Sequence, residues 1–371
     1  MPLFLSAALF ATGCTKQVSI EYLETPGVDL SKHHTIGVAG FQGQNGQDVS
    51  RLIETALGQA KSGKQSYFTI VDRDRLESVM KEQRLSLTGA IDPSRLKDVG
   101  KVLSLDALVT GNVASYEVRD SSYSENRSES YECGKKKTCS RDYTVGCTKR
   151  EAYVQLNISV LDTETAQNDA PLSPEGRASS EKCSDQSSTL TMGEELLRAA
   201  SQQAITEFVN QVTPHKVSER VMVKSGDDDA PLLFGSASDS VLASTMGKGV
   251  DLANAGLWAE AVTQFEDAVR QKPTCAACHY DLGLAMETLA TDLSDLQTAR
   301  DHYHQAVTSR PSDTSYTGAL KRIDRRISQW EELIRQTKDR EEAAQRAREA
   351  EQAKSTSKTT KPAKKGTKTS K

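Results

Sequence analysis

The sequence predicts an α/β domain of two or three layers, followed by an all-α domain of helical repeats and a charged tail. Three observations predict this order. Strand and helix patterns alternate over residues 31–212, which is typical of layered α/β domains. Small and aromatic residues recur at a helical-repeat spacing over 239–334. Large apolar residues are almost absent from 335–371.

The N-terminus carries the pattern of an export signal. Residues 3–11 are apolar except for Ser6, and this run is too short to span a bilayer. Thr12 and Gly13 then lead into Cys14, and a cysteine after small residues resembles a bacterial lipobox. We therefore expect 1–13 to be a signal peptide, Cys14 to carry acyl chains such as palmitate, and 14–30 to be a polar tether. A buried N-terminal strand is the alternative.

The remaining cysteines agree with export. There are six of them, and an even number in an oxidising compartment indicates disulfides. Proximity favours one bond between Cys275 and Cys278 and two bonds among the other four, without choosing the connectivity. The other four are Cys133, Cys139, Cys147 and Cys183.

The α/β domain begins with a strand over 34–41 and a helix over 48–60 whose apolar residues share one face. A short strand over 67–71 follows, and Asp72 is placed to cap the next helix. The further predicted elements are a helix from Pro93 to about Leu103, a strand over 105–118, a strand over 153–161 with strict apolar–polar alternation, and a long helix over 192–212.

Several motifs occur in an order that resembles the CsgG-type curli assembly lipoproteins. They are the run 68–77 (FTIVDRDRLE), the run 99–113 (VGKVLSLDALVTGNV) and the pair Asp162–Thr163 after the strand over 153–161. The resemblance covers about residues 30–212 and implies a mixed sheet with flanking helices. It also implies an outer-membrane lipoprotein facing the periplasm. Thr15 agrees with this location, since it is not the Asp that retains lipoproteins in the inner membrane.

The best-known members of that family form oligomeric secretion pores, which need hairpins with alternating apolar residues. The insertion over 119–150 has no apolar face and contains three cysteines. We expect it to be a soluble loop held by disulfides. The segment 168–186 is equally polar. Both departures argue against a pore.

A linker over 213–238 is expected to precede tetratricopeptide-like repeats over 239–334. The first repeat pattern comprises Gly249, Leu252, Gly256, Ala261, Phe265, Ala268 and Pro273, and the second comprises Leu282, Gly283, Ala285, Ala299, Tyr303, Ala306 and Pro311. A capping helix over 316–333 completes the array. Such modules bind a protein or peptide on their concave face, although a structural spacer or a dimerisation surface would show the same pattern.

The tail is predicted to be a solvated charged helix that gives way to a disordered, lysine-rich end. Residues 354–371 hold seven lysines and no acidic residue. This end could contact anionic polymers of the envelope or lipid headgroups. A floppy solubilising end is the simpler interpretation.

Cys275, Cys278 and His279 form the C-x-x-C-H pattern of c-type haem attachment. A local disulfide is the preferred interpretation, and a haem-bearing electron carrier is the alternative. We therefore predict no cofactor and no metal.

The sequence shows no nucleophile elbow, zinc-protease helix or recognisable carboxylate pair, so we expect no enzymatic activity. The leading hypothesis is a lipid-anchored envelope protein that acts in assembly or secretion through protein–protein contacts. The alternative is a regulator of a cell-wall synthase or another envelope machine. The expected partners are the membrane and an envelope protein, with a homo-oligomer left open and no nucleic acid.

Overall fold

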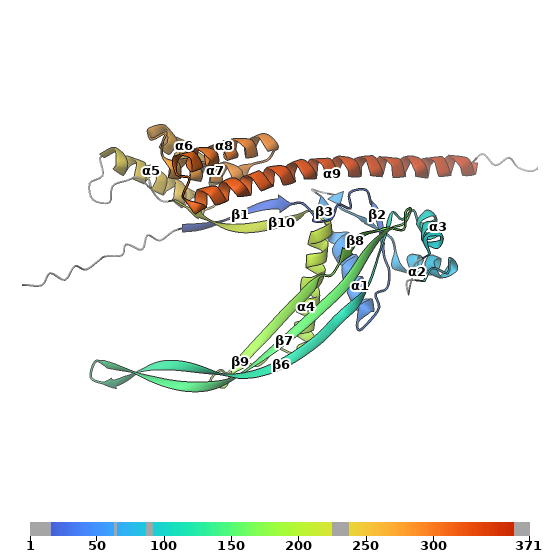
Figure 1. Ribbon diagram of the computed structural model, residues 1–371, viewed down its shortest axis with the longest axis horizontal. Coiled ribbons are helices and arrows are strands. Elements are labelled where there is room, and N and C mark those ends of the chain that lie inside the picture. Colours follow the sequence, from blue (N-terminus) through green and yellow to red (C-terminus); the bar gives the residue numbers. More distant parts are fainter. Residues whose placement is uncertain (1–15, 63–64, 87–91, 225–236, 360–371) are drawn as a thin grey trace, which may run out of the picture. The chain divides into compact units, whose positions relative to one another are not determined.

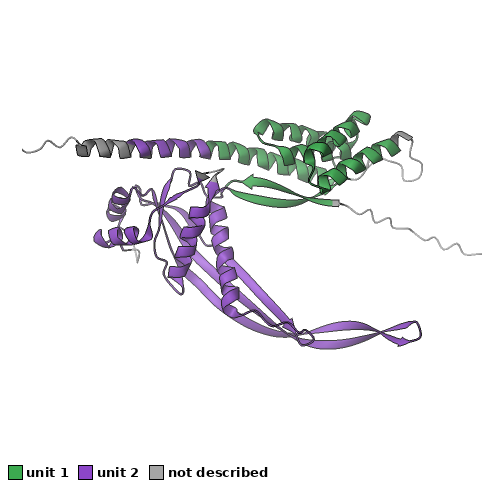
Figure 2. Cartoon of the chain, turned by 180° about the vertical axis from the view of Figure 1, so that it is seen from behind, with its two compact units in different colours: residues 1–25, 215–335 green, residues 26–214, 336–371 purple. Residues whose placement is uncertain are grey.

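The computed structural model describes residues 16–62, 65–86, 92–224 and 237–359, which divide into two compact units (Figures 1 and 2). The helical unit contains residues up to Thr25 and His215–Arg335. The α/β unit contains Pro26–Pro214 and the residues from Gln336 onward. The predicted fold class is confirmed, because a mixed sheet with helices comes first and an all-helical region follows.

A six-stranded mixed sheet forms the frame of the α/β unit. Its order is β5-β2-β6-β7-β8, and β9 pairs with another part of β7. The contacts of β2 with β5 and β6 are parallel, whereas β6, β8 and β9 are each antiparallel to β7. The strands are β2 (Thr35–Val38), β5 (Thr69–Ile70), β6 (Ala107–Gly134), β7 (Lys137–Asp162), β8 (Asn168–Leu172) and β9 (Glu175–Cys183), and the short β3 (Lys61–Ser62) and β4 (Gln65–Ser66) pair separately.

Helices cover both sides of this sheet. The helices α1 (Gly46–Gln59) and α4 (Gly193–Val212) share a core with the inward residues of the strands, including Val154, Leu156, Ile158 and Val160 of β7. The helices α2 (Arg73–Glu82) and α3 (Pro93–Leu103) form a second core with Leu108 and Leu161, which point the other way. Asp72 caps α2 as predicted, because its carboxylate accepts a hydrogen bond from the Arg75 backbone at 3.0 Å.

Both polar segments, the expected loop over 119–150 and the segment 168–186, form strands. Residues 119–150 continue β6 and β7 as a paired hairpin, and 168–186 contains β8 and β9. The prediction of a loop over 119–150 is therefore wrong, whereas its three cysteines form disulfides as expected. Backbone pairing does not require apolar side chains, so their absence did not prevent strand formation.

The helical unit begins with a two-stranded ribbon, which corrects two predictions. The strand β1 (Lys16–Glu24) falls in the expected tether, and β10 (His215–Val223) falls in the expected linker. They pair antiparallel along their whole length. Val18 and Ile20 alternate with polar residues and are buried in the same core as the helices, which explains the pairing. The rest of the predicted linker, residues 225–236, lies outside the described residues.

Five helices follow the ribbon: α5 (Ala237–Asn254), α6 (Trp258–Gln271), α7 (Ala276–Leu289), α8 (Leu293–Ser309) and α9 (Thr314–Thr359). Phe265 and Tyr303 are fully buried, and each contacts a glycine of the preceding helix, Gly249 or Gly283. The predicted capping helix over 316–333 lies within α9, which continues to Thr359. The lysine-rich tail is thus helical at its start, and 360–371 lie outside the described residues. No helix in the described part of the chain is long and apolar enough to cross a membrane.

The packing of α4 on β9 depends on one glycine. A Cβ at Gly176 would lie 1.9 Å from the carbonyl oxygen of Ala200 in α4. We expect Gly176→Ala to lower the free energy of unfolding by about 2 kcal/mol or more, because the helix must move away from the sheet. Chemical denaturation measures this. Gly146→Ala on β7 is the matched control, since its Cβ would meet no atom within 4 Å. Equal stability of the two variants would contradict the packing described.

Candidate functional site

The most distinctive surface is a two-stranded arm formed by residues 119–150 of β6 and β7 (Figure 1). The strand β9 pairs with β7 only as far as the Cys147–Cys183 rung. From Ser124–Gly146 to Gly134–Lys137, β6 and β7 therefore pair only with each other in the described chain. This free part has eleven residues in β6 and extends about 35 Å at roughly 3.3 Å per residue.

The two faces of the arm differ in chemistry. Residues directly opposite each other share a face, so the register sorts them. One face carries tyrosines and charges, namely Tyr123, Glu125, Arg127, Glu129, Tyr131, Arg141 and Tyr143. The other carries mostly hydroxyl and amide groups, namely Ser122, Ser124, Asn126, Ser128, Ser130, Ser140, Thr144 and Thr148. Neither face has alternating apolar residues, so both suit contact with water or with polar partners.

Such a hairpin is marginally stable in water, because beyond a small cluster at its base neither face builds a core. Two disulfides compensate for this. Cys133 and Cys139 are joined across the tip, six residues apart, and Cys147 is joined to Cys183 at the base, 36 residues apart. Cys133 is therefore bonded to Cys139 at the tip, and Cys147 of β7 is bonded to Cys183 of β9 at the base. The sequence had left this choice open.

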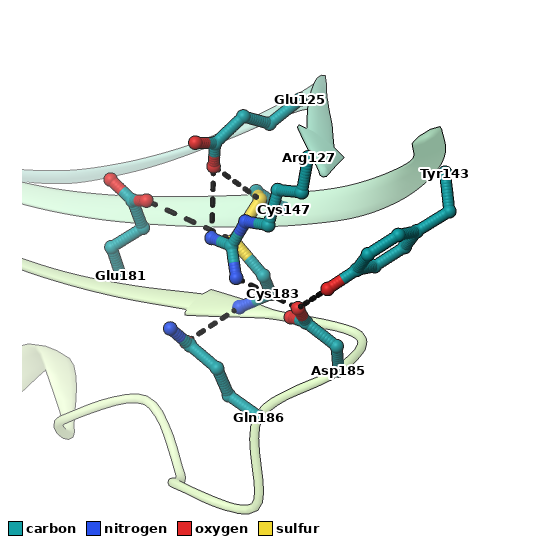
Figure 3. The surroundings of a disulfide bond; sticks show 8 residues. All are labelled: Glu125, Arg127, Tyr143, Cys147, Glu181, Cys183, Asp185 and Gln186. Atoms are coloured by element: carbon teal, nitrogen blue, oxygen red, sulfur yellow. Dashed lines mark hydrogen bonds and ion pairs between the residues drawn. A yellow bond between two sulfur atoms is a disulfide. The ribbon is translucent and has the colours of Figure 1, made fainter. Parts of the chain in front are cut away.

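The base of the arm is a small joint around the second disulfide (Figure 3). Val145, Cys147 and Cys183 are buried together. Arg127 lies over the sulfur atoms and donates hydrogen bonds to Glu125 at 2.9 Å and Asp185 at 2.8 Å. Hydrogen bonding to Glu125, opposed by partial desolvation and supported by Asp185, raises the pKa of Arg127. The turn after β9 is thereby fastened to the arm.

Two groups of side chains could suggest metal sites. Glu125, Cys147, Glu181 and Cys183 bring four ligand atoms together, but the two sulfur atoms are bonded to each other. A disulfide lacks the thiolates that bind metal.

The second group is His33, Asp162 and Asp169. Here the ammonium of Lys32 lies 2.9 Å from Asp169 and 3.5 Å from Asp162, so a cation of the chain already occupies the position between the carboxylates. His33 also contacts Asp169 at 2.9 Å. The cluster ties the segment before β2 to the β7–β8 hairpin.

The C-x-x-C-H pattern begins at the first residue before α7. Cys275 and Cys278 form a disulfide and are fully buried. The His279 ring contacts the Pro273 carbonyl oxygen at 3.0 Å and His302 at 3.1 Å. Covalent haem attachment uses both sulfur atoms, so this bond and a c-type haem exclude each other.

A buried ion network joins α7, α8 and α9. Glu287 has no exposed surface and accepts hydrogen bonds from Arg322 and Arg326, each at 2.7 Å, and from the Tyr303 hydroxyl at 2.5 Å. Burial opposes ionisation of Glu287. Hydrogen bonds and charge from Arg322, together with the charge of Arg326, outweigh it, so the pKa of Glu287 is lowered. This network fixes the start of α9 on the other helices.

The cysteines that the sequence singled out lie in separate parts of the chain. Cys14 lies outside the described residues, and the six other cysteines form three local disulfides rather than one cluster. Sequence reasoning missed the arm. Its signal is a period of two in which Ser122, Ser124, Asn126, Ser128 and Ser130 alternate with larger side chains. Both halves of this alternation are polar, so hydropathy shows no period of two there.

Comparison with known proteins gives one family. Residues 29–230, more than half of the chain, match the model described as "Curli production assembly/transport component CsgG". The curated proteins contain no match. Among solved structures, the chain is similar to lipoprotein GNA1162 from Neisseria meningitidis, with 14% identity and a TM-score of 0.24. That match covers 48% of this chain and 96% of the other. A TM-score this low carries no argument, so the family model is the informative finding.

Removal of the base disulfide should loosen the arm. We expect Cys147→Ala with Cys183→Ala to lower the free energy of unfolding by about 3 kcal/mol, since this bond closes the longer loop. Hydrogen exchange of the amides over 124–146 should become faster. The matched control is Cys133→Ala with Cys139→Ala, which should affect mainly the tip. Unchanged protection at 124–146 in the base variant would show that the ladder alone holds the arm.

Neutralising the buried carboxylate should unfold the helical unit more readily. We expect Glu287→Gln to lower the free energy of unfolding by about 3 kcal/mol, because Arg322 and Arg326 lose their buried carboxylate partner. Asp324→Asn, in an exposed pair with Arg300, is the control and should cost less than about 1 kcal/mol. Because the pKa of Glu287 is lowered from 4.5, its stabilisation is complete above that value and is lost as the pH falls through the lower folded value. Denaturation at several pH values tests this, and an equal cost for the two variants would contradict it.

Proposed function

Because the chain belongs to the CsgG family, we propose that it is an envelope lipoprotein that serves, without enzymatic chemistry, as an assembly or secretion component. The family match over 29–230 is the observation that carries this proposal. The printed description of the family names curli production and transport. The cargo of this chain is left to experiment.

The lipid anchor is supported by the position of Cys14. The ribbon strand β1 begins at Lys16, so a lipid on Cys14 would be two residues from folded structure. The anchor would then hold the ribbon of the helical unit close to the membrane surface, rather than on a long tether. We place the protein on the periplasmic side of the outer membrane, in line with Thr15.

The helical unit supplies a surface for a protein partner. Its consecutive helix pairs α5–α6 and α7–α8 pack through small residues against Phe265 and Tyr303, as tetratricopeptide-like repeats do. We interpret the unit as a repeat module that binds an envelope protein or peptide. The lysine-rich end after α9 could add contacts with anionic envelope polymers.

The arm favours a second candidate function, the regulation of a cell-wall synthase or another envelope machine. A hairpin that is polar on both faces presents side chains to an aqueous partner. A regulator would use it as a contact arm and would need no oligomer. An assembly component would form a homo-oligomer around its cargo.

Crosslinking in native envelopes tests the proposal. We expect the wild-type chain to be found in the membrane fraction with a reproducible set of crosslinked proteins. Cys14→Ser should move it to the soluble periplasmic fraction, because acyl chains on a cysteine supply the attachment. Quantitative fractionation with mass spectrometry measures both effects. If Cys14→Ser stays equally membrane-bound, the anchor is elsewhere.

The crosslinked species distinguish the two functions. Self-crosslinks that persist after detergent extraction as one large oligomer would support assembly or secretion. A monomer crosslinked to a cell-wall synthase would support regulation.

A further inference from the structure

The charges of the arm are distributed unevenly. Five of its eight basic residues are paired with carboxylates along the shaft: Arg119 with Glu117, Arg127 with Glu125, Arg141 with Glu129, Lys149 with Glu151 and Arg150 with Asp120. The distances of these pairs are between 2.6 and 2.9 Å. The shaft is thus close to electrically balanced.

The remaining three basic residues are adjacent at the tip. Lys135, Lys136 and Lys137 are exposed, and no ion pair is recorded for any of them within the described ranges. The seven-residue loop over 133–139 contains no acidic residue. The nearest carboxylate in sequence is Glu132, just before the loop. The excess positive charge of the arm is therefore concentrated at its far end.

The disulfide between Cys133 and Cys139 keeps this charge concentrated. It closes the loop, so the three lysines stay close together although like charges repel one another. The loop lies at the end of the free part of the arm, about eleven residues of strand beyond the last rung with β9. No carboxylate of the α/β unit is paired with these lysines among the described residues, so their charge is available to an external anionic surface.

We propose that the tip of the arm binds the anionic headgroup surface of a membrane. Lysine is a compact, strongly hydrated charge that suits a diffuse layer of lipid phosphates, whereas a defined phosphate ligand is usually held by an arginine fork. The tip contains three lysines and no arginine. It is also convex and has no buried polar group that would select one small anion.

Tyr131 supports a lipid surface over a soluble polyanion. It precedes the loop, is paired with Cys139, and is 47% exposed. Tyrosine is enriched at the headgroup level of membranes, where its ring meets the apolar boundary and its hydroxyl meets water. Lysines beside an exposed tyrosine form a small interfacial contact. It would add a weak second contact to the attachment proposed at Cys14.

Vesicle binding tests the proposal on the full chain with Cys14→Ser, which removes the lipid. The vesicles are pure phosphatidylcholine, or an equal mixture of phosphatidylcholine and phosphatidylglycerol. Each lysine near an anionic surface contributes about a fivefold gain in partitioning, so Lys135→Gln, Lys136→Gln and Lys137→Gln together should lower binding to anionic vesicles by at least about tenfold. Glu132→Gln should raise it severalfold. Pure phosphatidylcholine should bind all variants weakly.

The control removes the same charge elsewhere. Lys81→Gln, Lys97→Gln and Lys101→Gln, exposed lysines of α2 and α3, change the net charge equally and should lower binding by less than about threefold. Equal losses in the two variants would show that only net charge matters, and unchanged binding of the tip variant would exclude the tip. Either result overturns the proposal. So would a tip variant that keeps its vesicle binding but loses retention on immobilised polyglutamate, since the partner would then be an acidic protein segment.

Discussion

The antiparallel ladder between β6 and β7 is the interaction on which the α/β unit depends from its core to its tip. Inside the sheet, Val154 and its alternating neighbours fix the register by burial. A slip of one residue would turn all of them toward the wrong face. A β-bulge between Val113 and Ser115 shifts this register by one residue, and the shifted register continues outward beyond the main core and brings Tyr131 opposite Cys139. The buried half of the ladder thus sets the geometry of the exposed half.

Electrostatics divides the molecule in a similar way. Where charge is buried, as at Glu287, it is matched by two arginines and a tyrosine hydroxyl, because an unpaired buried charge is costly. Where charge is exposed on the arm shaft, it is matched by short pairs that contribute little stability but leave little net field. On the described part of the arm, Lys135–Lys137 break this balance, because they are exposed and have no recorded ion pair. The uneven distribution distinguishes charge that supports the fold from charge available to a partner.

Much of the frame follows from sequence patterns. The alternation in 153–161, the cap at Asp72 and the glycine–aromatic contacts of the helices are all visible in the residues, because burial imposes them. The arm and the β1–β10 ribbon were missed for physical reasons. The arm alternates hydroxyl and larger polar groups, so hydropathy gives no signal. The ribbon joins a strand that precedes the α/β unit in the sequence to one that follows it. No local pattern shows that Lys16–Glu24 has a partner at His215–Val223. Proximity in the sequence limits the possible disulfide pairs. The bond between Cys147 and Cys183, however, depends on the register between β7 and β9.

The ribbon also has a consequence for the order of events during folding. The hydroxyls of Ser19 and Ser218 are 2.7 Å apart although 199 residues separate them in the chain. A chain that emerges N-terminus first must therefore keep β1 waiting until the entire α/β unit has followed. During that interval β1 has no partner strand in the chain, so the acylation proposed for Cys14 would take place beside an unpaired segment. Closure of the ribbon therefore follows synthesis of the α/β unit, and the core that the ribbon shares with α5–α9 forms only after those helices have followed as well.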